Sequence, residues 1–318
     1  MSFEPIWRAV RASCIGICLA VGLLRWIPAA EAHGTVGNRV FIEPLFTEDA
    51  NVKNELVLPM MGFLVQPDGT WRTVEFSFEK VLYPHRLSVE LHDGRIDQHS
   101  GGRSIAGWDN LELGLKWEAW TSAKHEFVLS PALFIILPTS SANVTPQQTA
   151  LRPMLLYGKG LGDIRVAWLR PFAIQGDVGF QFSISGPRDR QLVYDGVLMY
   201  SIPYLNHSVR QADDHYLLED SLRRGFSLGA FFGNLFPYVE VNASSPVSGS
   251  PGGTVSRLRP GILWMGKYAE VSLAADIPLR APGLGPRHAG AVVLVDWFLN
   301  EILPSFDWTP LGRRARAH

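Results

Sequence analysis

Histidine and carboxylate side chains, which can bind metal ions, occur near the start of this 318-residue chain. The stretch AEAHGTVGNRVF (30–41) contains A-E-A, a small-residue pattern typical of signal-peptidase sites. Cleavage after Ala32 would make His33 the first residue of the mature chain. A terminal histidine offers both an amine and an imidazole, a donor set that suits copper. No other histidine lies in a recognisable copper-binding pattern, so a histidine with no role in binding is the alternative interpretation.

Two further clusters combine histidine with acids. HDGRIDQH (92–99) contains two histidines and two aspartates, and ADDHYLLED (212–220) contains four acids and one histidine. Either could hold a divalent cation, but a solvated loop explains both equally well, and neither has the regular spacing of a calcium loop. The metal-binding candidates are therefore His33, His92 and His99, and no bound cofactor is predicted.

Motifs for enzymatic chemistry are weak. GKGLGD (158–163) lacks the spacing of a phosphate-binding loop, and the G-x-S-x-G pattern of esterases does not occur. His99-Ser100 and His207-Ser208 are adjacent in sequence, but adjacent side chains of a strand point to opposite faces. We predict no catalytic residues and therefore no enzyme.

The first 32 residues have the features of a cleaved secretory signal. Two arginines precede an apolar run of 11 residues (14–24), which is too short for a spanning helix of roughly 20 residues. Both cysteines, Cys14 and Cys18, lie in this leader, so the mature chain has no disulfide, thiolate site or cysteine nucleophile. Removing one excess positive charge with the leader changes the net charge from −1 to −2, which gives no basic surface for nucleic acid.

Alternating polarity is the main structural signal of the mature chain. In FAIQGDVGFQFSIS (172–185) the even positions are apolar or glycine and the odd positions are polar or small. Fourteen alternating residues are about twice a usual strand, whereas a strand that spans a bilayer needs ~9–11. Similar segments recur, with Gly-, Pro- and Asp-rich turns between them: TVEFSFEKVLY (73–83), NLELGLKWEAW (110–120), YVEVNAS (238–244) and AEVSLAADI (269–277).

These segments predict an all-β chain with a signal peptide at 1–32 and one domain at 33–318. The fold that fits them best is a single antiparallel transmembrane β-barrel of about 12 strands, with its apolar face toward lipid and its polar face toward the lumen. Eight of the ten tryptophans belong to the mature chain, several of them near strand ends. A soluble β-sandwich is the alternative. A short helix is expected within 206–224, in a loop or plug.

Charged residues recur in mid-strand on the polar face, where a wet lumen would accommodate them. An excess of acids there would favour cations or neutral polar solutes in a pore. The solvated face of a soluble sheet is the alternative. The residues predicted to line the lumen are Glu75, Glu79, Glu112, Lys116, Glu118, Asp177, Gln181, Glu240, Glu270 and Asp276.

Several strand-like stretches resemble a known protein group: HGTVGNRVF, ELVLP, HEFVLSPAL, YGKGLGDI, RPFAIQGDVGFQF, YSIPYLNHSV, RPGILWMGKYAEVSLAADIPL and VLVDWFLNEILPSF. With them the chain resembles a largely uncharacterised group of proteobacterial outer-membrane β-barrels described as transporters. It is also distantly similar to barrel proteins of aromatic-degradation clusters. The resemblance implies a fold and a location in the outer membrane rather than an activity.

The expected function is passage of small solutes across the outer membrane of a Gram-negative cell. The expected partners are outer-membrane lipid, an unidentified solute and the barrel-assembly machinery. That machinery reads a terminal aromatic residue, and here the last strand is followed by a basic tail, so Phe298 or Phe306 would have to serve. Open channel, gated transporter and structural barrel stay open as alternatives, as does a soluble periplasmic β protein that binds copper through His33.

Overall fold

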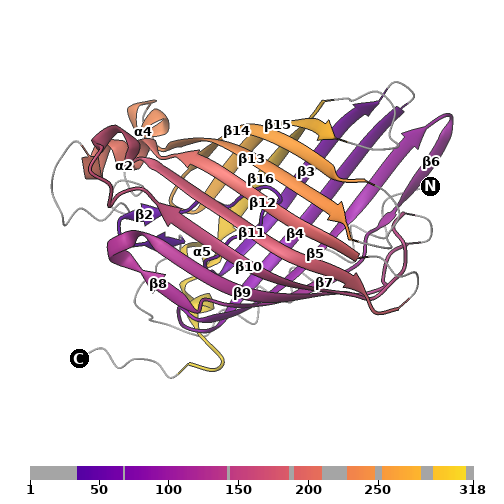
Figure 1. Cartoon of the computed structure of the whole chain (residues 1–318), viewed down its shortest axis with the longest axis horizontal. Coiled ribbons are helices and arrows are strands. Elements are labelled where there is room, and N and C mark those ends of the chain that lie inside the picture. Colours follow the sequence, from indigo (N-terminus) through magenta and orange to yellow (C-terminus); the bar gives the residue numbers. More distant parts are fainter. Residues whose placement is uncertain are drawn as a thin grey trace.

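A closed antiparallel β-barrel forms most of the molecule (Figure 1). The computed structural model describes residues 34–66, 69–141, 144–185, 190–209, 228–247, 253–280 and 289–312. The strands of the barrel are β3 (Glu55–Gln66), β4 (Gly69–Tyr83), β5 (Leu87–Ser100), β6 (Arg103–Trp108), β7 (Glu112–Trp117), β8 (Trp120–Ser122), β9 (Phe127–Ile136), β10 (Ala150–Gly160), β11 (Phe172–Ser183), β12 (Arg190–Tyr200), β13 (Leu235–Pro246), β14 (Val255–Met265), β15 (Ala269–Arg280) and β16 (Gly290–Phe298).

Neighbouring strands pair in chain order, and the sheet closes because β16 pairs with β3. The short strands β6, β7 and β8 follow one another in a single position between β5 and β9. The 14 strands of the sheet therefore occupy 12 positions around the barrel. The predicted antiparallel barrel of about 12 strands is confirmed.

The alternation of β11 shows how the sequence sets the two faces. Ile174 and Val178 are more than 40% exposed on the outer surface, whereas Ala173, Gln175 and Asp177 are at most 2% exposed. The same pattern on other strands leaves large apolar side chains exposed around the barrel, among them Phe63, Val74, Leu115, Leu133, Leu155, Leu198, Val239, Ile262 and Leu273. A continuous apolar outer surface with polar residues inside is the arrangement of a transmembrane barrel.

The predicted strand 110–120 is divided into β7 and β8. The backbone N–H of Glu118 donates to the carbonyl of Arg86 (2.8 Å), and the Glu118 side chain accepts hydrogen bonds from Val52 N–H and the Thr121 hydroxyl. The alternation alone could not show this break, because it depends on partners elsewhere in the chain.

Short helices lie outside the sheet. They are η1 (Ala123–His125), η2 (Ala167–Leu169), α2 (Ile202–Tyr204), η3 (Leu205–Val209), α4 (Leu228–Gly233), α5 (Leu299–Ile302) and η4 (Pro304–Asp307). Of the helix expected within 206–224, the structure describes only the first residues, in η3, and residues 210–227 lie outside the described part. In the described ranges no helix is long and apolar enough to span a membrane.

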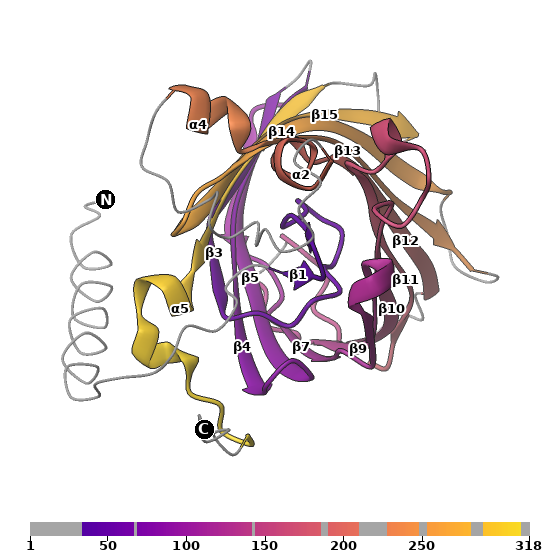
Figure 2. The same cartoon turned by 90° about the vertical axis from the view of Figure 1, so that its left-hand side faces the viewer.

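Residues 34–54, which we call the luminal segment, run inside the barrel (Figure 2). They begin with a small hairpin of β1 (Thr35–Val36) and β2 (Arg39–Val40). Gly37 turns this hairpin with a positive φ of 64°, and a Cβ there would lie 2.3 Å from the carbonyl oxygen of Ala123. The segment enters at the end of the barrel where β3 begins and β16 ends, which we call the terminal end.

After β16 the chain folds back along the outside of the barrel at the terminal end (Figure 2). Phe298 is the last residue of β16 and is buried. Phe306 packs edge-on against Phe78 at 5.9 Å, and its carbonyl accepts a hydrogen bond from Lys80 Nζ at 2.6 Å. The short helix η4 thus covers part of the outer face of β4. Whether Phe298 or Phe306 guides assembly stays a prediction.

The outer surface gives a prediction for Val178, which lies midway along β11 and faces outward. If this surface contacts lipid, Val178→Arg places a charge near the bilayer midplane and should lower the free energy of unfolding by about 2–4 kcal/mol. Ile184→Arg, just beyond the same strand and 57% exposed, should cost only about 0–1 kcal/mol. Urea unfolding in lipid vesicles measures both. Equal effects of the two substitutions would contradict a lipid-facing surface.

Candidate functional site in the barrel lumen

The lumen is lined by acids that the polar face of the sequence supplies. Of the ten residues predicted to line it, Glu79, Glu112, Lys116, Glu118, Asp177, Glu240 and Glu270 are at most 9% exposed. Glu75, Gln181 and Asp276 are partly buried. Because the luminal segment fills the middle of the ring, the wall residues contact protein there rather than an open pore.

Glu240 on β13 makes the largest number of these contacts. Its carboxylate accepts hydrogen bonds from the backbone N–H groups of Leu45 (2.9 Å), Phe46 (2.8 Å) and Thr47 (2.7 Å). It also accepts one from the Thr47 hydroxyl at 2.9 Å. Glu240 is fully buried, so its charge is stabilised by these donors instead of by water.

Four other wall carboxylates bind the luminal segment in the same way. They accept backbone N–H groups along its length: Glu270 from Glu43 (2.6 Å), Asp177 from Glu48 (2.8 Å), Glu118 from Val52 (3.3 Å) and Glu79 from Lys53 (3.1 Å). A typical intramolecular hydrogen bond contributes about 0.5–1.5 kcal/mol net, and one to a charged acceptor about 1.5–3 kcal/mol. Together with Glu240, these residues form what we call the acceptor row.

Lys53 holds the end of the luminal segment that joins β3. Its amine lies 2.7 Å from Glu43, 2.9 Å from Asp49 and 2.8 Å from Glu55. Burial lowers the pKa of Lys53, but these carboxylates outweigh it and keep the pKa well above its ordinary value. Burial raises the pKa of Asp49, and the neighbouring amines of Lys53 and Lys116 more than reverse this. Both groups therefore stay charged at neutral pH.

Arg39 fixes the other end of the segment to the loops of the terminal end. Its guanidinium donates to Glu126 (3.2 Å) and to the carbonyls of Pro171 (3.0 Å) and Arg170, and it lies 3.9 Å from the centre of the Tyr204 ring. The Tyr204 hydroxyl donates to Glu126 at 2.8 Å. Burial and the nearby Glu126 raise the pKa of Tyr204, so its hydroxyl stays a proton donor.

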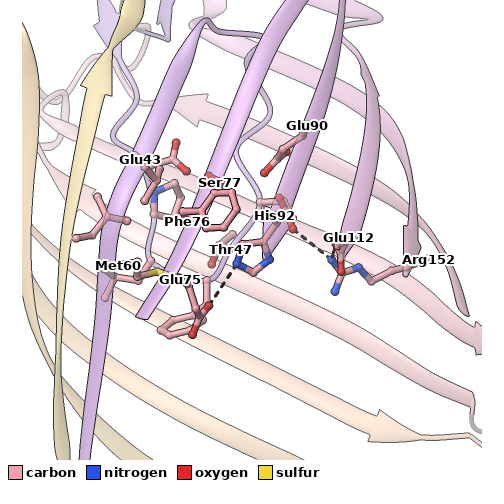
Figure 3. A pocket seen from close by; sticks show the side chains of 16 residues that line it. Glu43, Thr47, Met60, Glu75, Phe76, Ser77, Glu90, His92, Glu112 and Arg152 are labelled. Carbon is pink, nitrogen blue, oxygen red and sulfur yellow. Dashed lines mark hydrogen bonds and ion pairs between the residues drawn. The ribbon is translucent and has the colours of Figure 1, made fainter. Parts of the chain in front are cut away.

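Two adjoining cavities of about 200 Å³ each lie beyond the segment, toward the opposite end of the barrel. They share Glu75, His92 and Glu112 as lining residues. The inner cavity is bounded by residues 43–48 of the luminal segment and by Glu90 and Arg152 (Figure 3). The outer cavity is lined by Asp93, Asp109, Gln181 and residues of the loop before β10.

Ion pairs lie at the junction of the two cavities. His92 Nε2 lies 3.4 Å from Glu75, and Arg152 pairs with Glu112 on β7 and with Glu48 on the luminal segment at 3.4 Å (Figure 3). Arg152 thus connects the wall to the segment. From the opposite end inward, the cavities reach these ion pairs first and the luminal segment after them.

The predicted metal ligands do not come together. His92 faces the inner cavity, whereas His99 lies seven residues further along β5 and so on the other face, beside Thr70 and Ser104. His33 and the cleavage residue Ala32 lie outside the described residues, so copper binding by His33 stays a prediction. In the described ranges no group of three or more His, Cys, Asp or Glu residues is arranged to hold a metal ion.

Sequence reasoning missed the luminal segment and the basic residues that complete the site. Arg39 and Lys53 lie in a stretch without periodicity, and Arg152 and Glu90 were not distinguished from other strand residues. One signal is present in the sequence. Of the ten residues predicted to line the lumen, nine are acids or amides and one is a lysine, and buried acids require hydrogen-bond donors.

Comparisons with known proteins add little beyond the fold. No protein-family model matches the chain, and no curated protein matches it in sequence. Among solved structures, it is similar to the NanC porin (8% identity, 76% of this chain, 98% of that chain, TM-score 0.48). It is also similar to an outer membrane channel from Pseudomonas putida F1 (12%, 76% and 93%, 0.48) and to LpxR from Salmonella typhimurium (10%, 77% and 99%, 0.42). These values carry no function to this chain, and the resemblance to one protein group stays a prediction.

The acceptor row gives a prediction for Glu240→Gln. The change removes the charge and turns one acceptor oxygen into an N–H donor that faces the amides of residues 45–47. We expect the backbone amides of residues 43–53 to exchange hydrogen at least about tenfold faster, equivalent to about 1.4 kcal/mol. Hydrogen-exchange mass spectrometry of the protein in lipid nanodiscs measures this.

The matched control is Glu75→Gln, which makes the same chemical change in the lumen at a residue that contacts His92 instead of the segment. It should leave the exchange of residues 43–53 within about twofold of the unchanged protein. If both variants behave alike, Glu240 does not hold the segment.

Proposed function

We propose that this chain is an outer-membrane channel or transporter for small solutes, closed at its terminal end by its own luminal segment. The observation that carries the proposal is the combination of an apolar outer surface with cavities of about 200 Å³ inside. A barrel built only for structure has no need of a polar interior with free volume. In this proposal the leader directs export and is removed after Ala32, and lipid and the barrel-assembly machinery are partners.

Passage requires the luminal segment to move. The segment is joined to the wall by hydrogen bonds and ion pairs in the part of the chain that the structure describes, and it continues into β3 at Glu55. A rotation about residues near Glu55 would withdraw it without breaking a strand pair of the barrel. Segments that gate a path are commonly held by contacts that can be exchanged for others.

The cavities favour small polar solutes. The residues that line the outer cavity include the acids Glu75, Asp109 and Glu112, with His92 as the basic residue among them. Rings of carboxylates favour cations over anions in a pore. The proposal therefore includes cation preference, which agrees with the excess of acids in the sequence.

A disulfide between the segment and the wall tests the proposal. The Ser130 hydroxyl contacts the carbonyl of Ala50, and both residues are almost fully buried, so Ala50→Cys with Ser130→Cys is the pair to cross-link in a chain whose other cysteines lie in the leader. Oxidation during refolding would lock the segment. In planar bilayers we expect the oxidised protein to stay closed and the reduced protein to show openings.

The single variant Ser130→Cys, treated with the same oxidant and reductant, controls for the chemistry. Its conductance should not respond to either. Equal conductance of the locked and reduced double variant would show that the segment is not the gate, and absence of conductance in every protein would contradict the channel function.

A further inference from the structure

We propose that the luminal segment occupies the solute site of the channel, and that the solute is an elongated cation with several N–H donors, of the linear polyamine class. This inference rests on the channel function proposed above and names the ligand of that same path. It follows from what the acceptor row binds at present, from carboxylate oxygens that lack a donor, and from the balance of charge along the wall.

The acceptor row already binds a series of N–H groups along one segment of the chain. Its five carboxylates take donors from residue 43 to residue 53 of the luminal segment. None of these five contacts uses a side chain of the segment except the Thr47 hydroxyl, so the acceptor row binds mainly backbone N–H groups. Amines spaced along a chain present the same kind of donor, with a positive charge on each.

Two members of the row retain an oxygen without a partner. Oδ1 of Asp177 and Oε2 of Glu270 are buried and accept no hydrogen bond from the described residues. Asp177 is 2% exposed and Glu270 is 1% exposed, so neither oxygen is compensated by bulk water. Burying an unpaired carboxylate oxygen is costly, and a cationic donor would remove this cost. The backbone of the segment satisfies the row incompletely.

The charge of the wall excludes an anionic ligand. Among the row and its neighbours, Lys116 is committed to Glu79 at 2.8 Å, and Arg259 is committed to Asp276 at 3.1 Å. Asp177 and Glu270 accept hydrogen bonds from backbone N–H groups, and Glu240 accepts them from backbone N–H groups, the Thr47 hydroxyl and the Asn242 amide, all of which carry only partial charges. With the segment withdrawn, these carboxylates would face the lumen, and a polyammonium chain would replace several donors at once.

A path leads to this row from the opposite end of the barrel. The two cavities connect Asp109 with Glu90 and then with residues 43–48 of the segment. A cation entering there meets the part of the segment that Glu240 and Asp177 hold. Because it binds only where the segment has left, it shifts the population toward the displaced state by mass action.

Hydrogen exchange on the full chain in lipid nanodiscs tests this inference without requiring conduction. Spermidine, a linear triamine, should speed amide exchange of residues 43–53 at least about tenfold at millimolar concentration. Glutarate, and sodium chloride at matched ionic strength, should not. Exchange that is unchanged by spermidine, or accelerated equally by the salt, would overturn the proposal.

The variant Asp177→Asn distinguishes an effect on spermidine binding from an effect on the contact between the wall and the segment. Asparagine keeps an acceptor oxygen for the Glu48 N–H but loses the charge that a triamine needs, so the spermidine concentration for half effect should rise about tenfold. Asp163→Asn, at the rim and paired with His125 and Lys159, should leave it unchanged. Equal responses of the two variants would assign the spermidine effect to general charge and overturn the site.

Planar-bilayer recordings distinguish a failure of the polyamine site from a failure of the channel function. We expect a reversal potential on the cation side in a potassium chloride gradient, and block of the potassium current by spermidine added at the opposite end. A protein that conducts but prefers anions, or ignores spermidine, remains a channel without this ligand. A protein that never conducts, yet shows the spermidine-dependent exchange, retains the binding site and loses the transport function.

Discussion

Buried carboxylates that lack sufficient basic partners are the constraint on which this structure depends. A 12-position barrel encloses its polar face, so every acid on that face must find donors inside the molecule or be hydrated. The wall supplies few: Lys116 serves Glu79, and Arg152 serves Glu112. The luminal segment supplies backbone N–H groups to Glu79, Glu118, Asp177, Glu240 and Glu270. The segment and the wall are therefore complementary: the wall carboxylates accept the buried N–H groups of the segment, and these N–H groups compensate the buried carboxylates.

The outer surface follows from the same alternation. On β11, Gln175 and Asp177 face the lumen, whereas Ile174 and Val178 face outward. One alternating pattern thus produces both the apolar outer surface and the acidic wall. Closure of the sheet removes strand edges, whose backbone hydrogen-bonding groups lipid could not satisfy. The cavities at the opposite end remain because the segment stops short of it, which leaves Glu75, His92 and Glu112 lining free space.

The strands could be predicted from sequence because their signal is local. The alternation in 172–185 and 269–277 identifies both the elements and the inward position of Asp177 and Glu270. The luminal segment could not be predicted, since residues 34–54 have no periodicity and their conformation is set by distant partners: Leu45 and Glu240 are 195 positions apart. The division of 110–120 at Glu118 has the same cause, because Glu118 turns toward Val52. Local pattern predicts the barrel, and long-range charge balance decides what fills it.

The most direct test of the central claim is the amide NMR spectrum of the unmodified protein in lipid nanodiscs, with leucine, phenylalanine and threonine labelled by nitrogen-15. If carboxylates of the wall hold the luminal segment, the amide protons of Leu45, Phe46 and Thr47 resonate at low field, as expected for charged acceptors, and exchange slowly with solvent. Shifts typical of unstructured peptide, with exchange too fast to observe, would show that the segment does not occupy the lumen and would contradict the account.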